Sequence, residues 1–253
     1  MSNPRLIARL DIKMADLIKG IHLEGWRKIG NPWDFAKRYY DEGADELLYM
    51  DVVASLYDRN NLTDIVRKTA AEIFIPLCVG GGVRSLEDAS NLLRAGADKI
   101  ALNTAATKRP ELIAELAQRF GSQCIVLSLE AKQIGDGKWE AYTDNGREKT
   151  GLDAVDWAVR GVELGAGEVL ITSVDRDGTF KGFDLELIEC ISSRVSVPVI
   201  ACGGLGAPEH MLEAFTDSGA DAVAAARAIH TERTSLTALR QFGLHHQLPM
   251  RQI

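Results

Sequence analysis

Two stretches of the chain carry the same motifs in the same order, and this repetition limits the possible folds more than any other feature of the sequence. A Gly-Gly pair followed by Gly-Ala-Asp occurs at 80–81 and 96–98 and again, 123 residues later, at 203–204 and 219–221. Two further matches, at 43–46 with 165–168 and at 10–13 with 129–132, have offsets of 122 and 119 residues. Four matches at nearly one offset predict two homologous halves, whereas a solenoid would repeat at a much shorter period.

Short apolar runs alternate with amphipathic segments along the chain. The expected strands are residues 6–10, 46–53, 75–79, 99–102, 125–129, 168–174, 197–201 and 222–226, and the expected helices are residues 32–42, 62–72, 86–95, 110–120, 152–164, 185–193 and 208–218. This alternation predicts an α/β protein with a parallel sheet. Eight units in 253 residues favour a closed (βα)8 TIM barrel. No Gly-x-Gly-x-x-Gly follows the first strand, which weakens the alternative of an open dinucleotide-binding sheet. We expect one domain over residues 1–253, with half-barrels at about 1–122 and 123–253.

Composition and charge exclude several kinds of partner. The chain is 46% hydrophobic and 26% charged, as is usual for a globular protein. Its net charge of −7 disfavours nucleic acid or an anionic membrane as a broadly bound partner. No apolar run is long enough to span a membrane, and no signal peptide begins the chain. Neither the four scattered cysteines nor the five histidines have metal-binding spacing, so we expect reduced thiols, a cytoplasmic protein, no metal and no other cofactor.

Both Gly-Gly pairs occupy places where a phosphate can bind. Each follows an expected strand and precedes an expected helix, so backbone N–H groups and a helix N-terminus can point at an anion. Glycine lets the backbone approach that anion closely. The loops after the next strands, Asn103-Thr104-Ala105 and Ala225-Ala226-Arg227, would complete two phosphate sites on opposite sides of one barrel mouth. Ordinary tight turns would use the same glycines, and only their duplication favours phosphate.

Two carboxylates are expected at the same mouth. Asp11 ends the first expected strand and Glu130 ends the fifth, and barrel enzymes do their chemistry at the C-terminal ends of the strands. Opposed carboxylates suit general acid and general base roles, although a strand-end carboxylate can also cap a loop. The segment 175–179 adds polar groups, with a turn expected at Asp177-Gly178 beside the second phosphate.

Four charged residues stand at the opposite end of the expected barrel. Arg5, Glu46, Lys99 and Glu168 begin four of the strands, and the repeat relates Glu46 to Glu168. Such side chains often extend outward to solvent. If they point inward instead, they form a ring of alternating charge that closes the barrel floor and surrounds an axial passage.

The motifs in combination are specific. They are Leu10-Asp11, Val79-Gly80-Gly81-Gly82, Asn103-Thr104-Ala105, the run from Thr172 to Thr179, and Gly203-Gly204. With them, essentially the whole chain resembles the cyclase subunit of imidazole glycerol phosphate synthase, a lyase of histidine biosynthesis. That family leads ammonia from a partner glutaminase through the barrel. It uses the ammonia to split a bisphosphorylated ribulosyl-formimino aminoimidazole carboxamide nucleotide into imidazole glycerol phosphate and aminoimidazole carboxamide ribotide.

The resemblance implies a role for each candidate residue. Asp11 is the main acid/base, Glu130 takes the place of a second aspartate, and Lys19 lies in a mobile loop that closes over the substrate. The implied substrate-binding residues are Gly82, Asn103 and Thr104 for one phosphate, Asp177, Gly178, Gly204, Ala226 and Arg227 for the other, and Thr172. The ring of Arg5, Glu46, Lys99 and Glu168 matches the family's ammonia gate. A glutaminase subunit would dock at the N-terminal face to form a heterodimer.

Several departures from the family pattern cluster at the mouth. Glu130 replaces an aspartate, Arg9 replaces a small residue, and Cys202, Asn145 and Arg227 each replace a serine. These changes leave open a paralogue that channels ammonia for amidination of a nucleotide-linked sugar in polysaccharide biosynthesis. A sugar-phosphate isomerase that uses the two carboxylates without ammonia is a third possibility, against which the four-charge ring argues.

Arg9 has the clearest physical consequence among these departures. Alternation along the first strand directs it inward with Arg5 and Asp11, and a buried guanidinium must find a carboxylate. We expect it to pair with Glu130 across part of the lumen, with Asp11 and Ser128 as secondary partners. Such a pair would keep Glu130 ionised, make it a poor general acid, and narrow the ammonia route.

Overall fold

The computed structural model describes residues 3–54 and 62–253. Its first strand lies in the wall of a closed parallel barrel. The barrel strands are β1 (Arg5–Lys13), β4 (Glu46–Asp51), β5 (Leu77–Gly80), β6 (Lys99–Leu102), β7 (Ile125–Gly135), β10 (Glu168–Ser173), β11 (Val199–Cys202) and β12 (Ala222–Ala225). Each strand pairs in parallel with the next strand in this list, and β12 pairs in parallel with β1, which closes the barrel. The expected (βα)8 barrel is confirmed, and each expected strand is present.

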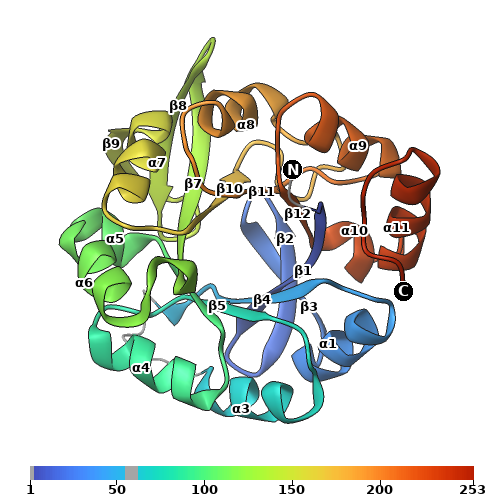
Figure 1. The fold of residues 1–253 in the computed structure, drawn as a ribbon, viewed down its shortest axis with the longest axis horizontal. Coiled ribbons are helices and arrows are strands. Elements are labelled where there is room, and N and C mark those ends of the chain that lie inside the picture. The colour runs from blue at the N-terminus through green and yellow to red at the C-terminus, as the bar shows by residue number, and fades with distance from the viewer. Residues whose placement is uncertain (1–2, 55–61) are drawn as a thin grey trace.

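Helices surround the barrel (Figure 1). The seven expected ones are α1 (Pro32–Asp41), α3 (Thr63–Glu72), α4 (Leu86–Ala95), α6 (Glu111–Phe120), α7 (Ala154–Glu163), α8 (Leu185–Ser192) and α9 (Pro208–Thr216). Local chemistry fixes several starts, because the side chains of Asn31, Ser85 and Asp153 accept N–H bonds from the first turns of α1, α4 and α7. The additional elements are α5 (Thr104–Lys108), the 3-10 turn η1 (Ser122–Cys124), α10 (Arg227–His230) and α11 (Leu236–His245).

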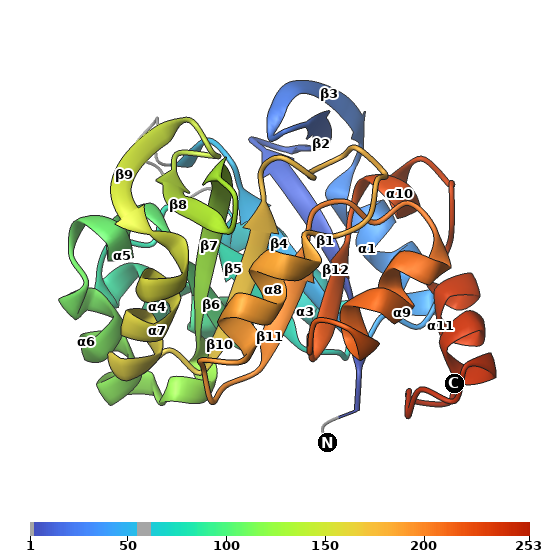
Figure 2. The same cartoon turned by 90° about the horizontal axis from the view of Figure 1, so that it is seen from above.

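Two antiparallel hairpins rise from the mouth, at the end opposite the chain termini (Figure 2). One consists of β2 (Asp16–Ile21) and β3 (Glu24–Gly30) and extends from β1; the other consists of β8 (Lys138–Thr143) and β9 (Glu148–Asp153) and extends from β7. The alternation of strands and helices did not predict them. The sequence signal for the second was Asn145-Gly146, a strong turn pair, and both residues have positive φ, 57° and 69°.

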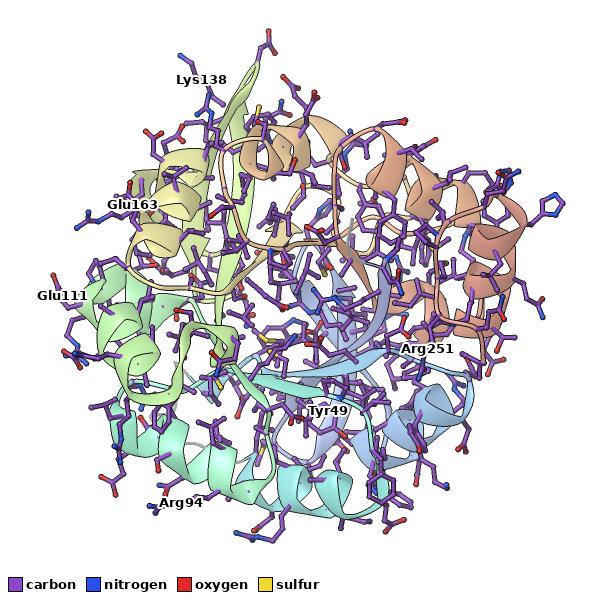
Figure 3. All side chains as sticks on the ribbon, in the orientation of Figure 1. Tyr49, Arg94, Glu111, Lys138, Glu163 and Arg251 are labelled. Atoms are coloured by element: carbon purple, nitrogen blue, oxygen red, sulfur yellow. The ribbon has the colours of Figure 1, made fainter. Side chains whose placement is uncertain are left out.

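Strand alternation divides the buried side chains into two groups. Leu6, Ala8 and Leu10 of β1 face outward and are fully buried beneath the helices. Ile7 faces inward and packs in the barrel lumen; its cluster also contains Leu48, Cys78, Val126, Leu170, Ile200, Ala222 and Ala224. Figure 3 shows the barrel centre filled with side chains, whereas Glu111, Lys138 and Glu163 project outward. In the described part of the chain, no helix has the length and apolarity needed to cross a membrane.

Candidate active site at the barrel mouth

Asp11 lies near the C-terminal end of β1, between two cations. Its Oδ1 accepts a hydrogen bond from Nε of Arg9 at 2.8 Å, and its Oδ2 accepts one from Nζ of Lys19 at 2.8 Å. All three side chains are buried. Burial alone would raise the pKa of Asp11, but the Arg9 guanidinium and the Lys19 ammonium hold that pKa well below its usual range. Asp11 is therefore ionised in this arrangement.

Lys19 joins the β2–β3 hairpin to the loop after β10. Its Nζ donates to Oδ1 of Asp177 at 3.0 Å as well as to Asp11. Burial would lower the pKa of Lys19, but Asp11 and Asp177 raise it above its usual value. The backbone N–H of His22 donates to the Asp177 carbonyl oxygen at 2.9 Å, and the backbone N–H of Leu23 donates to the Asp177 Oδ2 at 3.1 Å. The residue expected in a mobile loop thus lies in β2, which is docked over the mouth.

Arg9 points inward as expected, but the predicted pair with Glu130 is wrong. The Arg9 guanidinium instead donates to Asp11, to the Thr172 Oγ1 at 2.9 Å from Nη1, and to the Cys202 Sγ at 3.3 Å from Nη1. Asp11 is two residues away on the same strand, so both side chains share one face and the nearer carboxylate takes the guanidinium. Thr172, which accepts the hydrogen bond from Arg9, is fully buried beneath the mouth.

Glu130 is also buried but has no ion-pair partner among the described residues. Its Oε2 accepts a hydrogen bond from the Gly146 N–H at 2.8 Å, a contact supplied by the β8–β9 turn. Burial raises the pKa of Glu130 to about 7, against the smaller lowering effects of the Gly146 N–H and Arg9. The expectation that Glu130 stays ionised is therefore wrong, and the group can exchange a proton near neutral pH.

The first expected phosphate loop opens into a pocket of about 150 Å³. Gly82, Asn103 and Thr104 line it, and so does Glu130. The φ of Gly82 is +74°, which favours glycine and turns the backbone toward the pocket. Arg84 and Lys108 line the same pocket and were not predicted, because no motif contains them. The pocket brings three carboxylates (Asp51, Glu130 and Asp144), glycine-rich backbone and two cations together.

The second expected phosphate loop is more closed. Asp177, Gly178, Gly204, Ala226 and Arg227 all line one pocket, as expected, but it holds about 20 Å³, room for roughly one water molecule. Nη1 of Arg227 donates to the Gly178 carbonyl, and its guanidinium carbon lies 4.6 Å from the centre of the Phe180 ring. A phosphate would fit here only after the Arg227 side chain moves.

The four charges at the opposite end do point toward one another. Nη1 of Arg5 lies 2.9 Å from Oε2 of Glu46 and 3.1 Å from Oε1 of Glu168, and Nζ of Lys99 lies 2.9 and 3.0 Å from the same two atoms. Burial would lower the pKa of Lys99, but Glu46 and Glu168 raise it. These side chains form a closed ring of alternating charge at the N-terminal ends of β1, β4, β6 and β10.

Comparisons with known proteins place these features in a family context. A family model described as "Histidine biosynthesis protein" matches residues 5–235. Imidazole glycerol phosphate synthase subunit HisF of Legionella pneumophila is 65% identical over 206 residues, 81% of this chain and 97% of that protein. The same subunit of Myxococcus xanthus is 49% identical over 97% of this chain and 98% of that protein, and the one of Dehalococcoides mccartyi is 46% identical over 99% of both.

Proposed function

The chain belongs to the HisF family of imidazole glycerol phosphate synthase subunits, and from this membership we propose that it is the ammonia-dependent cyclase of such a synthase. The reaction splits a bisphosphorylated ribulosyl-formimino aminoimidazole carboxamide nucleotide into imidazole glycerol phosphate and aminoimidazole carboxamide ribotide. The two alternatives, ammonia supply for amidination of a sugar and isomerisation of a sugar phosphate, are not favoured, because the similar proteins are synthase subunits that match 81% or more of the chain.

Two carboxylates with different environments at one mouth support this proposal. Asp11 is held ionised by two cations, whereas Glu130 has a pKa of about 7. Forming an imidazole ring from ammonia removes protons from nitrogen and delivers protons to leaving groups. Asp11 acts as the main acid/base after Lys19 withdraws, and Glu130 accepts and returns a proton at the opposite side.

The two glycine loops are the proposed phosphate sites. Gly82, Asn103 and Thr104 hold one end of the substrate in the open pocket beside Glu130. Asp177, Gly178, Gly204, Ala226 and Arg227 hold the other phosphate, with the Arg227 guanidinium leaving the Gly178 carbonyl to meet it. Arginine suits this role, because its planar fork of donors matches phosphate oxygens.

A glutaminase subunit is the proposed partner, and it docks on the N-terminal face, where the ring of Arg5, Glu46, Lys99 and Glu168 acts as the ammonia gate. The loop between α3 and β5 lies on that face and exposes Phe74, at 77% of its surface. An exposed aromatic next to Ile75 and Pro76 is typical of a protein contact.

Turnover with an ammonium salt tests the proposed function directly. The purified chain, given the ribulosyl-formimino substrate and ammonium, is expected to form imidazole glycerol phosphate and the ribotide in equal amounts. Asp11→Asn should lose turnover by about 100-fold or more, and Asp41→Asn, a change at an exposed carboxylate of α1, should not. A folded wild-type chain without product formation would overturn the proposal.

A further inference from the structure

The first glycine pocket contains a buried carboxylate to which the proposed function assigns no role. Asp51 ends β4 and lines this pocket together with Gly82 and Thr104. Only 5% of Asp51 is exposed. Its Oδ1 accepts a hydrogen bond from the Val53 N–H at 3.0 Å, whereas its Oδ2 is buried and has no hydrogen-bond partner among the described residues. A buried oxygen without a donor is costly, so this oxygen is suited to accept a hydrogen bond from a bound ligand.

The electrostatic surroundings of Asp51 point the same way. Burial raises the pKa of Asp51, against the lowering effects of the Val53 and Ala54 N–H groups. Among the described residues, no cation forms an ion pair with this carboxylate. A further donor would favour the ionised form, so a ligand that supplies one gains a charge-assisted hydrogen bond.

Asp51 also lies beside the backbone that is proposed to hold the phosphate. β4 and β5 are neighbours in the barrel wall, and Met50 is in register with Gly80. The next residue, Gly81, packs directly against Asp51, because a Cβ placed on Gly81 would lie 2.9 Å from the Asp51 Cβ. A ligand group that bonds to Asp51 is therefore close to a phosphate held at Gly81 and Gly82.

The pocket offers two kinds of contact. Arg84 and Lys108 line it and attract a phosphate, whereas Asp51, Glu130 and Asp144 line it and repel one. Carboxylates instead accept hydrogen bonds from neutral donors. The pocket of about 150 Å³ has room for roughly ten water-sized positions, more than the atoms of a phosphate group alone. The remaining room suits a short carbon chain with a hydrogen-bond donor.

We propose that Asp51 makes this pocket selective for a phosphate ester with a hydroxyl on the carbon chain next to the phosphate. The Asp51 Oδ2 accepts the hydrogen bond from that hydroxyl. A rotation of the carboxylate about its Cβ–Cγ bond, a torsion with a broad energy well, presents this oxygen to the pocket. The inference rests on the proposed phosphate site at this loop, to which it adds a binding residue and a class of ligand, the hydroxylated alkyl phosphates. Glu130 keeps its proposed role in proton transfer.

Two matched ligands test the inference in the full-length chain. Glycerol phosphate has a hydroxyl on the carbon next to the ester carbon, and propyl phosphate has none. Binding is followed by NMR at the backbone amides of Gly82 and Thr104, which belong to this pocket. We expect the wild type to bind glycerol phosphate about tenfold more tightly than propyl phosphate, as a hydrogen bond to a charged group allows. Asp51→Asn, which keeps an oxygen for the Val53 N–H, should reduce this preference to about twofold or less.

Asp144→Asn is the matched control, because it removes a charge from the same pocket. It should change both affinities by the same factor and keep the preference. Equal affinities of the wild type for the two esters would overturn the inference, and this comparison stands even if Asp51→Asn does not fold. A preference retained in Asp51→Asn, or lost equally in Asp144→Asn, would also overturn it.

The same measurements separate this inference from the proposed function. If neither ester shifts the two amide signals, the first phosphate site fails and the selectivity fails with it. If the preference for glycerol phosphate is found but ammonium supports no turnover, only the proposed reaction fails.

Discussion

At the scale of single residues, Asp11 has both a proposed catalytic role and a structural role. It is the proposed acid/base, and it is also the shared partner of Arg9 and Lys19 in a buried cluster. Burial would raise the pKa of Asp11, yet its two cations lower it, so its charge contributes to stability. Removing that charge is therefore expected to affect folding as well as the proposed catalysis.

Asp11→Asn is therefore expected to lower the free energy of unfolding by about 3 kcal/mol, because it leaves the Arg9 guanidinium buried without a carboxylate. Urea denaturation followed by circular dichroism measures the change. The double variant Arg9→Met with Asp11→Asn should recover part of the loss, since it removes both charges. No recovery in the double variant would contradict the account, and Asp41→Asn serves as the control.

Glu130 should give the protein a stability that depends on pH. Its pKa is raised by burial from 4.5 to about 7, so the folded chain keeps a proton that the unfolded chain has lost between these values. The neutral Glu130 side chain favours folding fully below about pH 4.5. As pH rises through 7 the buried group ionises, and the free energy of unfolding falls by roughly 3 kcal/mol. Glu130→Gln should accordingly be more stable than the wild type at pH 8 and equal to it at pH 4. Thermal unfolding at both pH values measures this, with Glu148→Gln on β9 as the control.

At the scale of elements, the β2–β3 hairpin covers the mouth and is held there by polar and apolar contacts. Lys19, His22 and Leu23 bond to Asp177 of the loop after β10, and His22 Nδ1 lies 2.9 Å from the Val174 carbonyl oxygen. The hairpin's own ladder joins it to β1 at three residue pairs. The buried side chains of Leu17, Ile18 and Leu23 add apolar contacts to the polar cluster around Asp177.

Lys19→Met is expected to release the hairpin. Amide hydrogen exchange in residues 16–30 should become faster by about tenfold or more, because the variant removes two buried ion pairs that hold β2 down. Lys28→Met on β3 removes only an exposed pair with Asp16 and is the matched control. Unchanged exchange in Lys19→Met would show that backbone contacts alone close the mouth.

The two glycine loops should differ in their affinity for a phosphate. The first opens into a pocket of about 150 Å³, whereas the second, which Arg227 helps to line, has a volume of about 20 Å³. Titration with inorganic phosphate should therefore show two sites, the tighter one at Gly82. Arg227→Ala should weaken only the second site, because its guanidinium is that site's cation. Crystal soaking would assign the sites, and anions at neither loop would contradict the two-phosphate proposal.

At the scale of the whole molecule, the barrel separates a floor from a mouth. The floor has the ring of four charges and the exposed Phe74, and the mouth has Asp11, Glu130 and the hairpins. Apolar side chains and Arg9 line the lumen between them. The proposed partner face and the proposed active site therefore lie at opposite ends of the barrel.

Phe74→Asp is expected to weaken binding of the glutaminase subunit by about tenfold or more, since an exposed aromatic on the proposed docking face is a typical hot spot. Isothermal titration calorimetry measures the dissociation constant, and ammonium-supported turnover should be unaffected. Ile134→Asp, at an exposed position of β7 on the mouth side, is the control. Equal affinities for both variants would show that the partner binds elsewhere.

The sequence by itself determined the eight barrel strands, seven of the helices and the placement of Asp11 and Glu130 toward the C-terminal mouth, because periodicity and glycine spacing act within short windows. The origin in two half-barrels stays a prediction. Only the tertiary structure decided that Arg9 pairs with Asp11, that Glu130 has a pKa of about 7, and that Arg227 contacts the second loop. These outcomes depend on distances and burial across the closed barrel. Arg9 and Asp11 are close in the chain, but Arg9 is held beside Asp11 by Thr172 and Cys202, which are far away in the sequence, so no local pattern encodes the whole arrangement.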